Sequence, residues 1–429
     1  MRPSALMFGR YRAFKDEVRV ELKRLNVVIG KNGGGKSLIT RLPLLISGGL
    51  SGDSEHFLDL NFGGITHGYR YEDLVYQRSS QPFMLGLEIS DGTNIISFKT
   101  TLRHIVEKYA FGAESFELTK NGETIIEFSA ATPEDISSSN ASFLVKDRKG
   151  NIITSSVKFA GLFPSFVSES EELSRQLAEY RDLFEISLKN PGYLGPFRSA
   201  EGSLARLPRQ GVRTLGPKGE LALDFLGDNS LRGDGVVADQ VRKWFETFMY
   251  GNGVVIQMAG GIPRLMVHDN LRGVDVELSE TGAGFAQVLP VVAQIYGIKS
   301  GLIKNSISMV EQPELHLHPA AHGPVADLFV ELASQTSEVV QICETHSEQV
   351  ITRIRRRIAE RTLNASDVQL ISIGHQADEG EEIEPIRSIS FDKYGSPDAW
   401  PSGVFNEAFD DLVLLKAAAS NLDRTKQEG

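Results

Sequence analysis

Apolar and polar positions alternate most regularly in the last third of the chain. Apolar runs of strand length are followed there by longer runs with the periodicity of amphipathic helices, and short connections separate them. In chain order, these helix and strand patterns cover residues 284–297, 306–310, 319–333, 338–343, 347–360 and 367–373. Such an alternation predicts a largely parallel sheet covered by helices.

The earlier part of the chain has a more varied pattern. Mixed α/β spacing extends to about residue 110, and a hairpin is predicted across Asn121-Gly122, where both residues tolerate the positive φ values of a tight turn. Residues 191–235 are rich in glycine, proline and arginine, which predicts an ordered but irregular excursion. The other predicted elements are strands at 84–89 and 94–98, a second hairpin around 147–150, helices at 168–189 and 236–249, and short strands up to residue 278.

A glycine-rich loop near the N-terminus is the most informative motif. Residues 30–37 read GKNGGGKS, which fits the pattern G-x-x-x-x-G-K-[ST], and they lie between a short buried strand and the start of a helix. Backbone N–H groups of such a loop cradle phosphate oxygens, while the lysine reaches the β and γ phosphates and the serine holds Mg²⁺. We therefore predict nucleotide binding, with a plain glycine turn as the alternative. The predicted nucleotide-binding residues are Asn32, Gly33, Gly34, Gly35, Lys36 and Ser37.

The position of this loop bears on the domain organisation. It lies near the N-terminus, whereas the βα series lies near the C-terminus, so an insertion must split the nucleotide-binding domain. We predict an α/β protein in which residues 1–112 and 271–429 form a mixed sheet with flanking helices. Residues 113–270 would form a large α+β insertion.

A second motif begins with the apolar strand at residues 307–310, which ends in Glu311-Gln312-Pro313-Glu314. In P-loop proteins a carboxylate at such a strand end binds the Mg²⁺ complex, and a following glutamate can polarise the attacking water. Glu311 fits the first role. His316 and His318 follow closely, but no third ligand lies near them in sequence, so we do not predict a metal site there.

Two further motifs precede helices. Residues 279–287 place a hydroxyl and two glycines before a helix, which suits either a second phosphate site or an ordinary N-cap with a tight turn. His346 follows the apolar run 338–343 and leads into another helix, where its ring N–H could contact a γ-phosphate. A structural histidine is the alternative.

Composition narrows the function classes. The 429 residues are 41% hydrophobic and 24% charged, no apolar run is long enough for a membrane helix, and the N-terminus lacks a secretory pattern, so we expect a cytoplasmic protein. The single cysteine, Cys343, excludes an intramolecular disulfide.

Charge is the second compositional constraint. A net charge of −11 argues against the chain as a whole coating nucleic acid. The arginines of residues 353–361 form a local basic patch, for which a solvated helix surface is the alternative.

Taken together and in this order, the four motifs resemble an ABC-class ATPase of the RecF/SMC/OLD type. They correspond to a Walker A loop, a signature-like segment, a Walker B strand and a switch histidine. More narrowly, the chain resembles stand-alone bacterial AAA-type ATPases of this class, which carry Gly-Pro-x-Arg and Trp-Pro-x-Gly-x-Phe elements, here at residues 195–198 and 400–405. The motifs cover both ends of the chain, and the middle is matched only thinly.

The resemblance implies ATP and Mg²⁺ as cofactors and a head-to-tail homodimer, or a higher oligomer built from it. Each nucleotide would lie between the Walker A loop of one subunit and the signature of the other, so Ser279, Gly282 and Gly284 would act on a partner's ATP. Arg12 resembles a residue that stacks on the adenine. Gln77 and Gln81 both remain candidates for the Q-loop glutamine.

One position departs from the common pattern. Many ABC-type proteins have Asp-Glu where this chain has Glu311-Gln312, and a neutral amide cannot accept a proton from water. Either Glu314 or His346 orients the water, or hydrolysis is slow and the ATP-bound dimer is long-lived. We favour slow hydrolysis used as a switch.

The expected function is therefore that of a slow ATPase that acts on a separate effector protein, for example a nuclease. The resemblance places it in bacterial anti-phage defence or DNA maintenance, with nucleic acid contacted, if at all, through a local patch, and no role for a membrane. The alternatives are a non-hydrolysing scaffold or DNA clamp and an OLD-like nuclease. The nuclease is disfavoured because too little chain follows the ATPase motifs for a Toprim domain.

Overall fold

The computed structural model describes most of the chain. The described residues are 1–31, 33–51, 57–105, 110–131, 136, 142–198, 211–249, 251–259, 262–374, 385–400 and 414–416. Within them, no helix has both the length and the apolar character needed to span a bilayer.

A six-stranded sheet lies at the centre of the molecule, as the βα alternation predicted. Its first five strands are parallel and the sixth is antiparallel. In spatial order they are β11 (Gly192–Leu194), β15 (Ile307–Glu311), β16 (Val340–Glu344), β3 (Leu25–Gly30), β17 (Val368–Ile373) and β18 (Ile386–Ile389). Strands from both ends of the chain thus share one sheet, which confirms the predicted α/β class.

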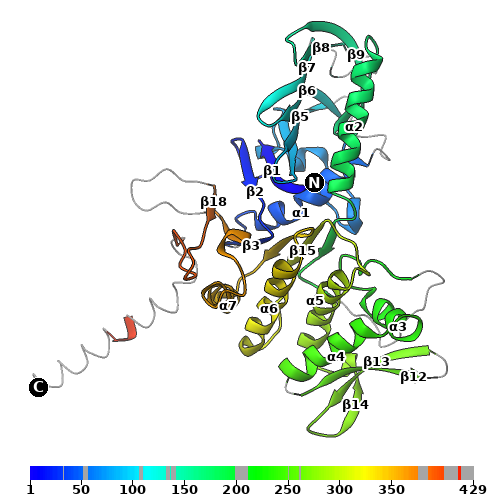
Figure 1. The fold of residues 1–429 in the computed structure, drawn as a ribbon, viewed down its shortest axis with the longest axis vertical. Helices are drawn as coiled ribbons and strands as arrows, with labels where there is room; N and C mark the ends of the chain where they lie inside the picture. Colours follow the sequence, from blue (N-terminus) through cyan, green and yellow to red (C-terminus); the bar gives the residue numbers. More distant parts are fainter. Residues whose placement is uncertain are drawn as a thin grey trace, which may run out of the picture.

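A nine-stranded antiparallel sheet is stacked on one side of the central sheet (Figure 1). The predicted hairpin at Asn121-Gly122 is present in it, with φ values of 53° and 81° at the two residues. In spatial order its strands are β10 (Phe163–Val167), β9 (Ile152–Ala160), β8 (Ser142–Asp147), β7 (Glu123–Ala130), β6 (Ala110–Lys120), β5 (Ile95–Ile105), β4 (Phe83–Ser90), β1 (Arg2–Gly9) and β2 (Val18–Glu21).

Helices cover both faces of the central sheet. Helix α1 (Lys36–Leu50) packs in the core between the two sheets, and the yellow to orange helices of Figure 1 lie on the opposite face. Other helices are α2 (Glu171–Ser187), α3 (Ala222–Arg232), α4 (Val236–Phe248), α5 (Ala283–Lys299), α6 (Pro319–Gln335) and α7 (Glu348–Ala359).

Smaller elements complete the described chain. A three-stranded sheet of β12 (Gly253–Ala259), β13 (Ile262–Asp269) and β14 (Val274–Glu277) lies beside α3 and α4. The 3-10 turns that matter for the site are η2 (Tyr71–Leu74), η3 (Tyr76–Arg78) and η6 (Leu278–Glu280), and two others are η1 (Phe62–Gly64) and η7 (Ala365–Asp367).

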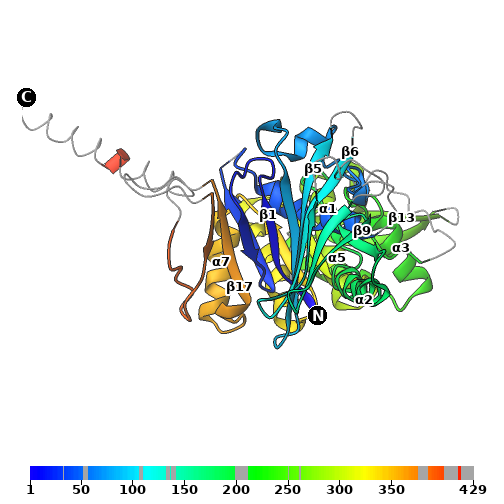
Figure 2. The same cartoon turned by 90° about the horizontal axis from the view of Figure 1, so that it is seen from above.

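Burial on both faces explains why the central strands read as unbroken apolar runs. Leu25, Val27 and Ile29 of β3 point into the core formed with α5, α6 and α7, whereas Val28 points into the core formed with α1 and the antiparallel sheet. All six residues of β3 are buried. Figure 2 shows the antiparallel strands lying over this layer when the molecule is seen from above.

The expectation of an irregular excursion over residues 191–235 is wrong in two places. The chain forms β11 there, and it forms α3, whose Leu223, Phe225 and Leu226 enter the core. Helix α3 has only 11 residues and contains Gly227, so its helical pattern is short and weakened by a poor helix former.

The division into three segments stays a prediction. The proposed boundary between residues 112 and 113 falls inside β6, which pairs along its length with β5. The boundary at residue 270 falls in the turn between β13 and β14.

Candidate functional site

Parallel strands bring the predicted motifs to one edge of the central sheet. Their carboxyl ends carry Gly30, Glu311 and Glu344, and the register places Glu311 beside Glu344 and Gly30 beside Ile373. Ligands of open α/β sheets bind outside this edge. The fold therefore unites residues that are more than 300 positions apart in sequence.

The glycine loop has a geometry that only glycine allows at its first position. Gly30 has a φ of 144°, and a Cβ there would lie 2.2 Å from the carbonyl oxygen of Ile373. Gly35 has a φ of 100° and begins α1, whose N-terminus receives no side-chain cap. The start of α1 therefore suits an anion, although the Leu38 N–H already donates to Gly35 O. Asn32 lies outside the described residues.

Lys36 is buried and turned onto its own loop. Its Nζ donates to the carbonyl oxygens of Gly30 and Lys31, at 2.9 and 2.8 Å. Burial lowers the pKa of Lys36, although the Glu344 carboxylate opposes the shift. A bound phosphate would give this ammonium an anionic partner in place of neutral carbonyls.

Glu344 is a residue of this site that the sequence reasoning missed. Its carboxylate, 4% exposed, accepts hydrogen bonds from Ser37 Oγ at 3.0 and 3.3 Å and from Thr40 Oγ1 at 3.3 Å. Burial, and then repulsion from Glu311, raises the pKa of Glu344 to about 7. An acidic residue at the end of an apolar run was the available signal, but the sequence pattern indicated His346, two residues later.

Glu311 is also buried at the strand ends, yet its carboxylate is already occupied. Arg41 of α1 donates from Nε and Nη2 to the two oxygens, at 2.7 and 2.8 Å. Tyr193 of β11 adds its hydroxyl at 2.9 Å. Burial and the neighbouring carboxylate raise the pKa of Tyr193, which keeps this hydroxyl protonated as a donor.

The loop after β15 is held in an unusual backbone conformation. Gln312 has a φ of 46°, and its N–H donates to the carbonyl oxygen of Glu344 at 2.7 Å. Glu314 Oε1 accepts the backbone N–H of His346 at 2.8 Å, whereas Glu314 Oε2 is among the buried atoms that lack a partner in the described chain. Partial burial, and then the charge of Lys36, lowers the pKa of His346, so its ring is neutral near pH 7.

Arg198, the arginine of the Gly-Pro-x-Arg element, joins this loop to α5. The side chain is 2% exposed and donates to the carbonyl oxygens of Glu311, Gln312 and Gln287, at 2.8, 2.6 and 2.6 Å. The Gln287 side chain in turn bonds the Arg198 backbone. Burial lowers the pKa of Arg198 to about 10, which still leaves it charged at neutral pH.

The signature-like segment forms η6 and the start of α5. Gly282 is the N-cap of α5, no side chain caps this helix, and the Thr281 hydroxyl donates instead to Leu278 O at 2.6 Å. A Cβ on Gly284 would lie 2.9 Å from His316 O, so the helix start packs closely on the loop after β15. The structure places Ser279 within η6 and describes its backbone only.

The segment that contains Arg12 lies beside the glycine loop. Arg12 has a φ of 51° and donates its N–H to Leu74 O at 2.9 Å, while the neighbouring Phe14 ring lies 3.4 Å from where a Cβ of Gly35 would be. Gln77, in η3, is exposed and bonds the hydroxyl of Tyr76, and Gln81 is exposed as well. The Q-loop assignment stays open.

Three arginines of the basic helix α7 are held by two carboxylates. Arg353 and Arg357 both pair with Asp327 of α6, and Arg356 pairs with Glu360. Arg355 donates to Gly395 O and lies 6.0 Å from the ring of Trp400. Residues 401–405, the rest of the Trp-Pro-x-Gly-x-Phe element, lie outside the described residues.

Two other groups named from the sequence have structural environments. His318 caps α6 by accepting the N–H of Ala320, and Cys343 is buried in β16. Among the residues that the structure describes, no three His, Cys, Asp or Glu side chains cluster to hold a metal ion.

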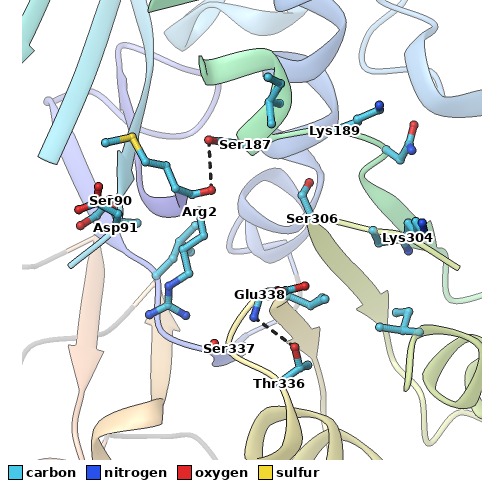
Figure 3. A pocket seen from close by; sticks show the side chains of 18 of the residues that line it. Arg2, Ser90, Asp91, Ser187, Lys189, Lys304, Ser306, Thr336, Ser337 and Glu338 are labelled. Atoms are coloured by element: carbon cyan, nitrogen blue, oxygen red, sulfur yellow. Dashed lines mark hydrogen bonds between the residues drawn. The ribbon is translucent and has the colours of Figure 1, made fainter. Parts of the chain in front are cut away.

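A hollow of about 1430 Å³ lies at the opposite, amino edge of the central sheet (Figure 3). Arg2, Lys189 and Lys304 line it together with Asp91 and Glu338. Side chains of both charge signs line it, so its lining favours no single class of ligand. It contains none of the motif residues.

Comparison with known proteins agrees with the motifs. Residues 225–351 match the family model described as "AAA ATPase domain", a span of under a third of the chain that contains the signature-like segment, β15 and His346. No curated protein sequence matches the chain.

Similar solved structures include three SMC head domains. One, bound to the C-winged helix domain of ScpA, has a TM-score of 0.48 and 12% identity, and covers 92% of this chain and 99% of its own. The head domain from Thermotoga maritima has a TM-score of 0.41 and 12% identity, and covers 87% of this chain and 95% of its own. The third is a head domain with an extended coiled coil, bound to the C-terminal domain of ScpA derived from Pyrococcus furiosus. It has a TM-score of 0.44 and 11% identity, and covers 97% of this chain and 99% of its own.

These TM-scores are below 0.5, so the assignment depends on the geometry and the family match. A P-loop between β3 and α1, two strand-end glutamates on adjacent parallel strands, and a family match over the second half of the domain all agree. The chain therefore has the α/β fold of a P-loop ATPase, and its residues 225–351 match an AAA ATPase domain.

Proposed function

We propose that the protein binds ATP and Mg²⁺ between two subunits arranged head to tail, hydrolyses ATP slowly, and passes its open or closed state to a separate effector protein. The resemblance suggests anti-phage defence or DNA maintenance as the setting, a cytoplasmic location, and a nuclease as one kind of effector. The observation that carries the proposal is the glycine cradle with Lys36 and Ser37 at the sheet edge that also holds Glu311, Glu344 and His346.

The residues present fit a Mg²⁺–nucleotide complex. Gly30 is confined to glycine by the close approach of Ile373 O, and the N-terminus of α1 has no side-chain cap. The Ser37 hydroxyl and strand-end carboxylates are the hard oxygen donors that Mg²⁺ prefers. When bound, the metal would neutralise charge on the phosphates.

The second half of each nucleotide site would come from the partner subunit. The N-terminus of α5 has no side-chain cap, and its N-cap Gly282 has open space around it. A helix start of this kind suits a phosphate. Ser279, Gly282 and Gly284 would thus contact ATP bound by the other subunit.

Slow turnover is inferred from Gln312. Its backbone is fixed on both sides, by Glu344 O and by Arg198, and its amide cannot act as a base. Glu314 is buried and bonded to the His346 backbone, so of the two other candidates His346 is the better placed to orient water. Its neutral ring can donate or accept.

The experiment measures ATP binding and steady-state turnover of the full chain beside Lys36→Ala. We expect micromolar or tighter ATP binding, turnover well under about 1 s⁻¹, and loss of both in the variant. The Lys304→Ala variant, altered at an exposed lysine on the opposite edge, is the matched control and should behave as wild type. A wild-type protein that binds no ATP would contradict the proposal.

A non-hydrolysing scaffold or DNA clamp is the second candidate, and Gln312 is the observation that favours it. Binding without any turnover, together with a Gln312→Glu variant that does turn over, would support it. The pairing of the α7 arginines with Asp327 and Glu360 gives nucleic acid binding by that helix no support.

A further inference from the structure

Glu344 lies where a P-loop needs a metal ligand. Ser37 follows the P-loop lysine, and the hydroxyl at this position holds Mg²⁺ in such loops. In this chain the carboxylate within 3.0 Å of that hydroxyl belongs to Glu344, at the end of β16. The sequence motif indicated Glu311 on the neighbouring strand, β15, instead.

Both carboxylate oxygens of Glu311, the candidate from the motif, already accept hydrogen bonds, and a cation already balances its charge. Oε1 accepts from Arg41 Nε and from Tyr193, and Oε2 accepts from Arg41 Nη2. The pair is bidentate, and the Glu311 side chain is 2% exposed. Separating the two would leave a buried carboxylate and a half-buried guanidinium without partners, which is strongly unfavourable.

Glu344 has the opposite environment. Its hydrogen bonds come from the neutral hydroxyls of Ser37 and Thr40, while the nearby Lys36 ammonium is directed to loop carbonyls. Buried carboxylates are ordinarily paired with cations or coordinate metals. A divalent cation beside Ser37 would supply that partner without disturbing the Arg41–Glu311 pair.

We propose that Glu344, with Ser37, binds the Mg²⁺ ion of this site, and that Glu311 is a positioning residue that ties β15 to α1 through Arg41. Helix α1 thus contacts both glutamates, with Ser37 facing Glu344 and Arg41 facing Glu311. The inference rests on the proposed ATP binding. Mg²⁺ keeps several waters and takes one or two carboxylates, so one glutamate suffices.

Metal binding to the full chain in complex with ADP tests this without turnover. Mn²⁺ replaces Mg²⁺ and is followed by electron paramagnetic resonance, and ADP affinity is measured in EDTA. We expect Glu344→Gln to weaken Mn²⁺ binding roughly tenfold or more while metal-free ADP affinity stays near wild type. Glu311→Gln should keep near wild-type Mn²⁺ affinity, and the exposed Glu338→Gln is the matched control.

The result that overturns the inference is a Glu344→Gln protein with wild-type Mn²⁺ affinity, or a folded Glu311→Gln protein that loses it. Thermal melting verifies that each variant is folded. If Glu344→Gln does not fold, Glu344→Asp, which shortens the side chain by one methylene, is used in its place. If the wild-type protein binds ADP and the variants give either of these results, only the inference is refuted. Wild type that binds no nucleotide refutes the proposed function itself.

Discussion

At the scale of single residues, a few buried charges organise the carboxyl edge of the central sheet. Arg198 satisfies carbonyl oxygens from three segments that would otherwise be buried without donors. In the sequence, Arg198 was indicated only because residues 195–198 resemble the Gly-Pro-x-Arg element of a known family. What it contacts depends on β11 pairing with β15, more than 100 residues away, which local patterns do not specify.

Replacing Arg198 should therefore destabilise the protein. Arg198→Met keeps the bulk but leaves several buried carbonyls unpaired, for which we expect a loss of roughly 3 kcal/mol or more in the free energy of unfolding. Arg198→Lys should recover only part, because one ammonium cannot reproduce the planar fork. Urea denaturation measures both, and unchanged stability of the methionine variant would contradict the contact pattern.

The elevated pKa of Glu344 makes stability depend on pH. The folded-state value is about 7 against an ordinary 4.5, so the nucleotide-free folded protein takes up a proton below pH 7 that the unfolded chain does not. The resulting stability is fully present below about pH 4.5 and is lost as pH rises through about 7. Its size is on the order of 3 kcal/mol.

Glu344→Gln should remove this contribution. Denaturation in EDTA at pH 5.5 and pH 8 measures it, with Glu338→Gln as the control. We expect wild type to lose more stability than the glutamine variant between the two values. Equal losses would mean that Glu344 does not have a raised pKa.

At the scale of elements, the βα series was predictable because strands buried on both faces give continuous apolar runs, as in β15 and β16. The hairpin at Asn121-Gly122 was predictable because its turn is chemically specific. Helix α3 and strand β11 were not, since a short helix containing glycine and a three-residue strand are stabilised by distant partners. Glu344 was not predictable either, because its contacts depend on where β16 lies relative to α1, which is distant in sequence.

Helix α5 gives a prediction at this scale. Gly282 has ordinary backbone angles and open space around it, so aspartate fits there, and its charge favours a helix N-terminus by about 0.3–1 kcal/mol. The same charge would repel a partner's phosphate. Gly282→Asp should fold and bind ATP as wild type does but should not dimerise, which light scattering detects. Dimerisation of this variant would exclude α5 from the interface.

At the scale of the whole molecule, the central sheet combines strands from both ends of the chain and carries the antiparallel sheet on one face and the helices on the other. Helix α5 and the Gln312 loop, which lies at the same sheet edge as the P-loop, are joined through the Arg198 contacts with Gln287 and Gln312. When a nucleotide contacts α5 of one subunit, that contact is therefore mechanically connected, through α5, to the Gln312 loop of the same subunit. This connection is what a switch requires.

The most direct test of the account is the molar mass of the full chain, measured by light scattering with Mg²⁺ and no nucleotide, ADP or ATP. The account predicts that ATP doubles the mass, that ADP does not, and that Lys36→Ala stays at the nucleotide-free mass in all three conditions. A wild-type protein that binds ATP tightly, yet has the same mass with and without it, would contradict the proposal of an ATP-bridged dimer.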